Sequence, residues 1–140
     1  MIQPKVAKPS KVDEARAYDQ ATFRDLGVCV RCRRVDPVWG VNRDHRKGRG
    51  VGGLTVVENL QLLCGSGTTG CHGWRTSRQA DAIAEGYAVP GYADPAEWPA
   101  RRWVATGIGT VRHIWVLYRH DGTWDEITEQ DALRRMGRDA

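Results

Sequence analysis

Four cysteines form two pairs that could hold a metal ion. Cys29 and Cys32 make a C-x-x-C pair, and Cys64 and Cys71 make a second, wider pair further along the chain. Structural zinc prefers four tetrahedral thiolate or imidazole ligands, so two loops that bring these pairs together would supply its coordination sphere. Residues 65–70, inside the second pair, are all Gly, Ser or Thr and can loop out without moving the ligands. We therefore predict a structural Zn²⁺ site that stabilises the fold; the alternative is two buried apolar cysteines and two exposed ones.

Acid–base and metal-ligating residue types lie between and beside the cysteine pairs. Asp44 and His45 are adjacent, Asn59 follows a glycine-rich stretch, and His72 comes directly after the last cysteine. In order and approximate spacing this segment resembles the HNH endonucleases, whose fold is the ββα-metal fold, or His-Me finger. The residues that carry the resemblance are Cys29, Cys32, Asp44, His45, Gly52, Gly53, Asn59, Leu60, Cys64, Cys71 and His72. Residues 63–74 are similar to HNH proteins encoded by bacteriophages, and the resemblance covers about residues 25–86.

The resemblance implies a role for each matched polar residue. His45 would be the general base that takes a proton from the attacking water, because imidazole titrates near neutral pH. Asp44 and His72 would bind one catalytic divalent ion (Mg²⁺, Mn²⁺, Ni²⁺ or Zn²⁺), which would neutralise charge on the phosphate and the leaving oxygen. Asn59 would bond to the backbone near His45 and fix the orientation of its ring. Since adjacent residues of a regular strand point to opposite faces, we expect an irregular strand end at Asp44 and His45.

Two positions depart from the most frequent pattern of that family. Asp44 stands where many members have histidine, a position at which carboxylate variants also occur. Thr76 stands where many members carry another histidine or acid, one turn after the third motif position. One alternative for His72 also stays open, because its imidazole could replace Cys64 or Cys71 as a zinc ligand.

Basic residues are concentrated around the candidate catalytic residues. From Arg31 to Arg49 the chain carries seven Lys or Arg and two acids, in a protein whose formal net charge is +4. Such a cluster suits a polyanion such as nucleic acid, although a solvated surface face has the same composition. We predict that four flanking residues contact DNA phosphates and position the duplex without reading bases. They are Arg43, Arg46, Lys47 and Arg49, and Arg75 and Arg78 could extend the surface.

Local patterns outline the elements that must position these residues. Ser10 with Asp13 is typical of a helix N-cap, and apolar spacing predicts a helix over residues 11–26 that Gly27 ends. Short strands are expected at 38–41 and 54–57, on either side of the glycine-rich turn 48–53. A helix over 73–85 should follow and end at Gly86.

The last third of the chain has the alternation of a half-buried antiparallel sheet. Strands are expected at 102–105, 111–118 and 124–127, with Asp121-Gly122 as a hairpin turn. Thr128 with Asp131 predicts a short terminal helix. This sheet either covers one side of the nuclease module or docks a partner; its aromatic strands favour the first interpretation.

Length and composition restrict the class of protein. A chain of 140 residues, 41% of them hydrophobic, favours one domain with a modest core. It has no stretch resembling a signal peptide and none near the roughly 20 apolar residues that span a bilayer. We therefore expect no membrane association and a cytoplasmic location, which is the bacterial host cytoplasm if the protein is phage-encoded. There, cysteines serve as metal ligands more often than as disulfides.

The sequence thus predicts an α+β fold, with a zinc-braced ββα-metal core, an N-terminal helix and a C-terminal antiparallel β extension. Residues 1–9 should form a flexible tail, 10–86 the HNH nuclease domain and 87–140 the β-rich extension. The expected activity is metal-dependent hydrolysis of phosphodiester bonds in double-stranded DNA, by nicking or cutting with low sequence specificity. The alternatives are a non-catalytic zinc DNA-binding module, a phage DNA-packaging factor active only with its terminase, and an RNA substrate.

Overall fold

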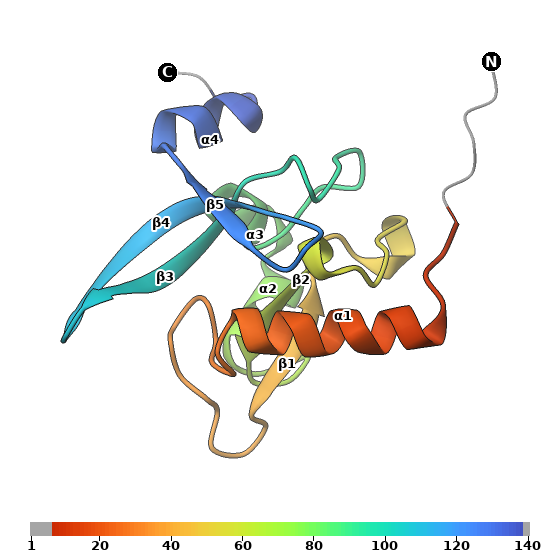
Figure 1. Ribbon diagram of the computed structural model, residues 1–140, viewed down its shortest axis with the longest axis horizontal. Helices are drawn as coiled ribbons and strands as arrows, with labels where there is room; N and C mark the ends of the chain where they lie inside the picture. The colour runs from red at the N-terminus through yellow and green to blue at the C-terminus, as the bar shows by residue number, and fades with distance from the viewer. Residues whose placement is uncertain (1–6, 139–140) are drawn as a thin grey trace.

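A computed structural model describes residues 7–138 and shows a mixed α+β fold (Figure 1). Within this range four α-helices and two short 3-10 helices accompany a two-stranded and a three-stranded antiparallel sheet. The predicted α+β class is confirmed. The expected flexible tail falls mostly on residues 1–6, which lie outside the described residues.

Helix α1 (Lys11–Arg24) begins where the local pattern predicts. The Ser10 side chain accepts a hydrogen bond from the Asp13 amide at 3.1 Å and so caps the first turn. The helix ends two residues earlier than expected, because Leu26 and Gly27 both adopt positive φ angles, 58° and 71°. On its buried face Ala17 and Ala21 meet Val57 and Leu60, at and just before the start of the second strand.

The central sheet consists of β1 (Val41–His45) and β2 (Leu60–Cys64). The strands pair antiparallel, with Asp44 opposite Gln61 and His45 opposite Leu60. Every residue of β2 is buried, since α1 and α2 both pack against it. The strands predicted at 38–41 and 54–57 are therefore wrong in position. A hydrogen-bonded turn occupies 36–40, and Val57–Asn59 forms the 3-10 helix η2 that leads into β2; a second 3-10 helix, η1 (Arg49–Val51), lies in the glycine-rich turn.

The helical segment after β2 is divided into α2 (Gly70–Ser77) and α3 (Gln79–Glu85). The break falls at Arg78, whose φ and ψ of −120° and 55° are not helical. Gly86 ends α3 with φ 89°, as predicted. A Cβ at this glycine would lie 2.6 Å from the Trp115 ring, so the close approach of the two chain segments also requires glycine here.

The C-terminal part forms the predicted antiparallel sheet. Strands β3 (Ala100–Gly107), β4 (Thr110–Tyr118) and β5 (Trp124–Ile127) pair in the order β3-β4-β5, and α4 (Glu129–Arg135) follows. The Thr128 side chain accepts from the Asp131 amide, which confirms the predicted cap. Ala100, Ile114 and Val116 form a small core of this sheet. None of the described helices is long and apolar enough to cross a membrane.

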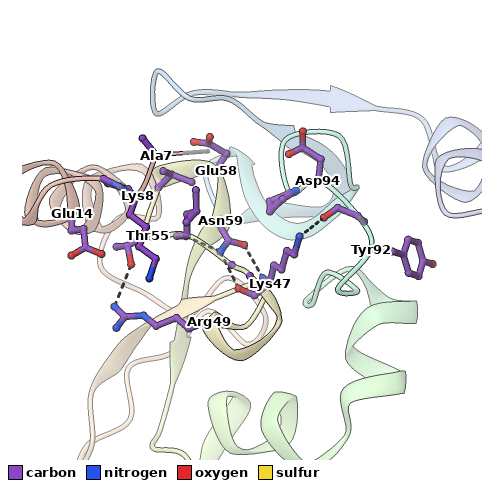
Figure 2. A pocket seen from close by; sticks show the side chains of 17 residues that line it. Ala7, Lys8, Glu14, Lys47, Arg49, Thr55, Glu58, Asn59, Tyr92 and Asp94 are labelled. Carbon is purple, nitrogen blue, oxygen red and sulfur yellow. Dashed lines mark hydrogen bonds between the residues drawn. The ribbon is translucent and has the colours of Figure 1, made fainter. Parts of the chain in front are cut away.

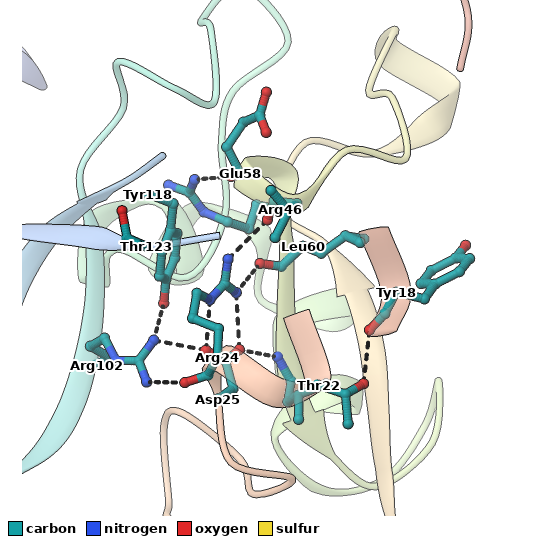
Figure 3. A network of polar contacts seen from close by, with 12 residues as sticks. Tyr18, Thr22, Arg24, Asp25, Arg46, Glu58, Leu60, Arg102, Tyr118 and Thr123 are labelled. Carbon is teal, nitrogen blue, oxygen red and sulfur yellow. Dashed lines mark hydrogen bonds and ion pairs between the residues drawn. The ribbon is translucent and has the colours of Figure 1, made fainter. Parts of the chain in front are cut away.

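A buried ionic network joins α1, β2 and the C-terminal sheet (Figure 3). Asp25 is 2% exposed, and its carboxylate accepts hydrogen bonds from Arg24, from Arg102 at 2.7 Å and from the Leu62 amide at 3.1 Å. Arg24 also donates to the carbonyls of Val57 and Leu60. One carboxylate therefore pairs with two buried guanidinium groups that come from distant parts of the chain.

Asp25→Ala is expected to lower the free energy of unfolding by about 3–5 kcal/mol, because it leaves Arg24 and Arg102 buried without their counter-charge. Urea denaturation at 25 °C measures the change. Glu126→Ala is the matched control: its ion pair with Arg112 is exposed, and its loss should cost less than about 1 kcal/mol. Equal losses in the two variants would contradict the assigned role of Asp25.

His113 provides a pH-dependent contribution to stability. Its ring stacks on Trp103 with centroids 4.4 Å apart, and its Nε2 lies 2.9 Å from the Tyr87 hydroxyl. Burial and the charge of Arg101 lower the pKa of His113 to about 4, below the value near 6.5 of an unfolded chain. The folded state therefore favours neutral imidazole, and its contribution is complete above pH 6.5 and is lost as the pH falls toward 4.

We expect the free energy of unfolding of the wild-type protein to fall between pH 6.5 and 4 more steeply than that of His113→Gln. Denaturation curves recorded across this range, with the variant subtracted from wild type, isolate the histidine from acid-titrating carboxylates. Parallel pH profiles would show that the neutral His113 ring does not stabilise the fold.

Candidate functional site

The four cysteines converge between β2, α2 and the loop after α1. Their Sγ atoms all lie within 4.8 Å of one another, and Cys32 and Cys64 are 3.5 Å apart. A tetrahedral zinc with Zn–S bonds of about 2.3 Å requires sulfurs about 3.8 Å apart, so the cluster fits that ion. The predicted grouping of Cys29, Cys32, Cys64 and Cys71 is confirmed, and no disulfide joins them.

Hydrogen bonds from backbone amides and from a neighbouring thiol reach the sulfurs of the cluster. The amides of Cys32 and Cys71 each point at the Sγ of the first cysteine of their pair, at 3.4 Å. A hydrogen bond from Cys71 lowers the pKa of the Cys29 thiol to about 5 despite its burial. The same hydrogen bond raises the pKa of Cys71, and burial raises the pKa of Cys32 to about 11, so one proton-poor sulfur is stabilised by its neighbours. Residues 66–69 close into an exposed turn of their own, so the wide second spacing bulges outward and leaves the ligands in place. The cluster has the donor set of a structural zinc site.

Asp44 and His72 are brought together on the α2 side of β1. His72 Nε2 lies 3.4 Å from Asp44 Oδ1, and this contact is the main reason why the pKa of His72 is raised. The other carboxylate oxygen accepts from Gln61 Nε2 at 3.0 Å and lies 3.3 Å from Arg75 Nε. Gln61 and Arg75 thus orient the carboxylate and leave Oδ1 facing the imidazole. A divalent ion could take one oxygen and one nitrogen from this pair.

The structure also places His72, the alternative zinc ligand, and Thr76, which stands where many HNH endonucleases carry another histidine or acid. The four sulfurs complete a zinc donor set among the described residues without an imidazole, and His72 lies beside Asp44 instead. The Thr76 hydroxyl donates to the His72 carbonyl at 3.0 Å. It is therefore occupied within α2.

His45 lies on the opposite face of β1, against α1. Its Nε2 is 2.8 Å from Thr55 Oγ1, and Arg49 Nε donates to the same nitrogen at 3.3 Å. The Tyr18 ring meets the imidazole edge-on, with centroids 6.2 Å apart. Burial, followed by the charge of Arg49, lowers the pKa of His45, so the ring is neutral at physiological pH. Because Nε2 accepts from Arg49, it is the unprotonated nitrogen.

The expected irregular strand end is absent. Pairing continues through His45 and Leu60, so Asp44 and His45 follow the ordinary alternation of a strand. Asp44 is buried beneath α2, whereas His45 is half-buried beside α1. The two side chains share the last two positions of β1 and diverge across the sheet. A substrate that meets both must therefore lie at this end of the strand.

Asn59 holds the backbone immediately after His45. Its Oδ1 accepts from the Lys47 amide at 2.7 Å, and its Nδ2 donates to the carbonyls of Lys47 and Leu54. The predicted backbone bonding by Asn59 is confirmed. Gly53 completes this packing: a Cβ there would lie 1.8 Å from the Lys47 carbonyl oxygen, so only glycine fits.

The predicted phosphate contact by Arg46 is wrong. The residue is fully buried, and its guanidinium donates to the carbonyls of Glu58, Pro95 and Trp98. Burial lowers its pKa to about 10, which leaves it charged at neutral pH. Arg46 lies directly after the last residue of β1, where carbonyls of two distant chain segments enclose its side chain.

The other basic residues divide by exposure. Arg75, proposed above as an extension of the DNA surface, is almost completely buried and donates to the His45 and Arg46 carbonyls. Lys47 is half-buried and donates to the Ala93 carbonyl at 3.1 Å. Arg43 and Arg49 are exposed and stay predicted phosphate contacts.

A groove of about 1090 Å³ borders the site (Figure 2). It lies between the start of α1, the glycine-rich turn and residues 92–95, and Arg49 and Thr55 form the part that reaches His45. Lys8, Lys47 and Arg49 line it together with Glu14, Glu58 and Asp94, so its charges are mixed. Asp44, His45 and His72 are not among its lining residues. The groove approaches the candidate base and not the Asp44–His72 pair.

Tyr18 and Thr55 are site residues that sequence reasoning missed. Tyr18 accepts a hydrogen bond from Arg49 at 2.8 Å, and the Arg43 guanidinium lies 4.7 Å from its ring centroid. The helical pattern of α1 marks Tyr18 as core-facing but carries no information on this contact. Thr55 bonds both His45 and Arg49, and its place before a 3-10 helix has no sequence signature.

No protein-family model, curated protein or solved structure matches this chain. The functional argument therefore rests on the residues and on their geometry.

Proposed function

We propose that this protein is a metal-dependent DNA endonuclease of the HNH type, with a zinc-braced ββα-metal core. The observation that carries the proposal is the Asp44–His72 pair, with 3.4 Å between Oδ1 and Nε2, at the same end of β1 as a neutral His45. Residues distant in sequence thereby combine a hard carboxylate oxygen, an imidazole and a base. This combination suits hydrolysis of a phosphodiester.

Each residue has a defined task in this proposal. Asp44 Oδ1 and His72 would hold the divalent ion, which supplies neutralisation of the phosphate and the leaving oxygen. His45 would accept the proton of the attacking water at Nε2, the nitrogen toward which Arg49 donates. Asn59 fixes the backbone beside it through three hydrogen bonds. Because the 3′ oxygen is the leaving group, hydrolysis leaves a 5′-phosphate and a 3′-hydroxyl.

The substrate is proposed to be double-stranded DNA that crosses the end of β1. Arg43 and Arg49 are the exposed cations nearest His45 in sequence; Arg49 contacts its ring and Arg43 lies over the neighbouring Tyr18 ring. They would hold phosphates on either side of the scissile bond. No segment of the sequence resembles a base-reading recognition helix, and α1 meets these two arginines through Tyr18. Low sequence specificity is therefore expected.

A second candidate, a nuclease that acts only with a packaging terminase, is favoured by one observation. His45 Nε2 already has two partners, Thr55 and Arg49, so the base is engaged in the free chain. A partner or DNA that displaces the Thr55 hydroxyl would release the nitrogen for water. This version predicts that the isolated protein does not nick DNA and gains activity when terminase is added.

Nicking of supercoiled plasmid by purified protein tests both versions. Reactions contain Mg²⁺, Mn²⁺ or Ni²⁺ in turn, with EDTA as the negative reaction and Asp44→Ala and His72→Ala as variants. The proposal expects relaxed circles with at least one metal, none with EDTA and strongly reduced activity in both variants. Activity that EDTA or these variants leave unchanged would contradict it, as would inactivity with every metal both alone and with terminase. A labelled RNA assayed in parallel decides the substrate.

A further inference from the structure

A rigid turn before β1 presents apolar side chains to solvent. Asp36 and Gly40 exchange two backbone hydrogen bonds, at 2.9 and 3.2 Å, and Asp36 Oδ1 accepts from the amides of Val38 and Trp39 at 2.8 and 2.7 Å. Within this turn, residues 36–40 and called here the Trp39 turn, Val38 is 76% and Trp39 59% exposed. The Trp39 indole is therefore exposed to solvent, although hydrogen bonds fix the backbone of the turn that carries it.

The end of the Trp39 turn and the segment just before it are both tied to the cysteine cluster. The Gly65 amide, directly after Cys64, donates to the Gly40 carbonyl at 3.1 Å. On the other side the Cys29 amide donates to the Arg34 carbonyl at 3.0 Å. The segment forms the lower edge of the molecule in Figure 1, between α1 and β1. Because its backbone is fixed before any partner arrives, binding through it costs little conformational entropy.

The charge around the turn is one-sided. Arg33, Arg34 and Arg43 are exposed, and within residues 7–138 no carboxylate lies within ion-pair distance of any of them. The only acid in the segment 31–43 is Asp36, whose Oδ1 accepts from two amides of the turn. An exposed indole among unpaired guanidiniums suits a polyanion that also offers apolar surface, as the grooves of duplex DNA do.

We propose that the Trp39 turn, with Arg33 and Arg34, is a second contact surface for duplex DNA. The inference rests on the proposed nuclease function and extends its substrate site. Trp39 precedes His45 by six residues, which span at most about 20 Å along a strand. That distance corresponds to about six base pairs at about 3.4 Å each. The arginines hold phosphates and the indole inserts into the groove, up to about half a helical turn from the bond that is cut.

Binding of a labelled 30-base-pair duplex, followed by fluorescence anisotropy without added divalent metal, tests this surface. All proteins carry His45→Ala, so that no DNA is cut, and each is checked for one bound zinc. We expect Trp39→Ala to weaken binding about five- to tenfold and Trp39→Phe to retain most of the affinity. Arg33→Gln with Arg34→Gln should lower the slope of log affinity against log salt by about 1–2, as loss of one or two phosphate contacts requires.

Matched controls separate the surface from general effects. Phe23→Ala removes an aromatic side chain that is 84% exposed on α1, and Arg112→Gln with Arg119→Gln removes two exposed arginines of the C-terminal sheet. Neither control should change affinity more than about twofold. If the Arg112/Arg119 control loses more DNA affinity than the Arg33/Arg34 variant, then Arg33 and Arg34 are not the phosphate contacts of this surface.

The outcomes also separate this inference from the proposed nuclease. If the His45→Ala protein binds duplex DNA and the Trp39 and Arg33/Arg34 variants bind equally well, the second contact surface is wrong and the nuclease proposal stands. Unchanged DNA binding combined with Trp39-dependent association with a protein, or with a second copy in sedimentation, would assign the turn to that partner instead. If no duplex binds at any salt concentration, both proposals fail.

Discussion

Cys29→Ser is expected to lose zinc and to leave much of the chain unfolded at 25 °C. Three of the four cysteines belong to one buried cluster with Val30, Leu63, Ala82, Tyr87 and Ala88, so the ion would lie where the core is built. Zinc contributes on the order of 10 kcal/mol or more to the folding of small zinc domains. A domain of this size has a total stability of only about 5–15 kcal/mol. Elemental analysis should give one zinc per wild-type chain, and circular dichroism should show the loss of structure.

His72→Ala is the control for the ligand set. The imidazole lies beside Asp44 and outside the sulfur cluster, so this variant should keep one zinc and its circular dichroism spectrum. If His72→Ala loses the ion and Cys71→Ser keeps it, the histidine is a ligand and the four-cysteine assignment is wrong. A wild-type protein that folds fully without any metal would exclude a structural role for zinc.

His45→Ala is expected to reduce plasmid nicking by about 10²- to 10⁴-fold, the range of a lost general base. The fold should survive, because the half-buried ring makes its hydrogen bonds only to Thr55 and Arg49 among the described residues. The rate is measured at saturating metal, with zinc content and circular dichroism recorded for the same preparation. Under these conditions a slow variant reports on proton transfer.

His120→Ala is the matched control for this substitution. His120 is exposed at the end of β4, and its removal should change the nicking rate less than about twofold. If His45→Ala nicks as fast as wild type while Asp44→Ala is inactive, then another group takes the proton. If all variants nick equally, the activity belongs to a contaminant.

Features whose physics is local could be predicted from the sequence. The caps at Ser10 and Thr128 and the glycine that ends α3 depend on neighbours within four residues. The cysteine cluster was also predictable, because two separate cysteine pairs supply the four ligands that a structural zinc ion prefers. The bonds from Asn59 to backbone were expected only from the resemblance to the HNH endonucleases, and the structure contains them.

What could not be predicted depends on burial by distant segments. Strand β2 is buried at all five positions, so it lacks the period-two alternation by which strands are recognised, and the strand was expected before it. Arg46 and Arg75 look like surface cations in sequence, yet carbonyls and a carboxylate from other elements enclose them. The regular end of β1 is likewise set by its partner strand and not by the glycines that follow.

Arg46 decides how far the protein can be divided. Its guanidinium is sequestered by carbonyls on both sides of position 86, those of Glu58 and of Pro95 and Trp98, and the Val89 amide returns a bond to the Arg46 carbonyl. A fragment comprising residues 10–86 would expose an ionised group built to be enclosed, directly beside His45. A segment that is transferred to another protein by recombination must therefore include residues 87–99 together with residues 10–86. The smallest transferable unit is longer than the segment that carries the candidate site.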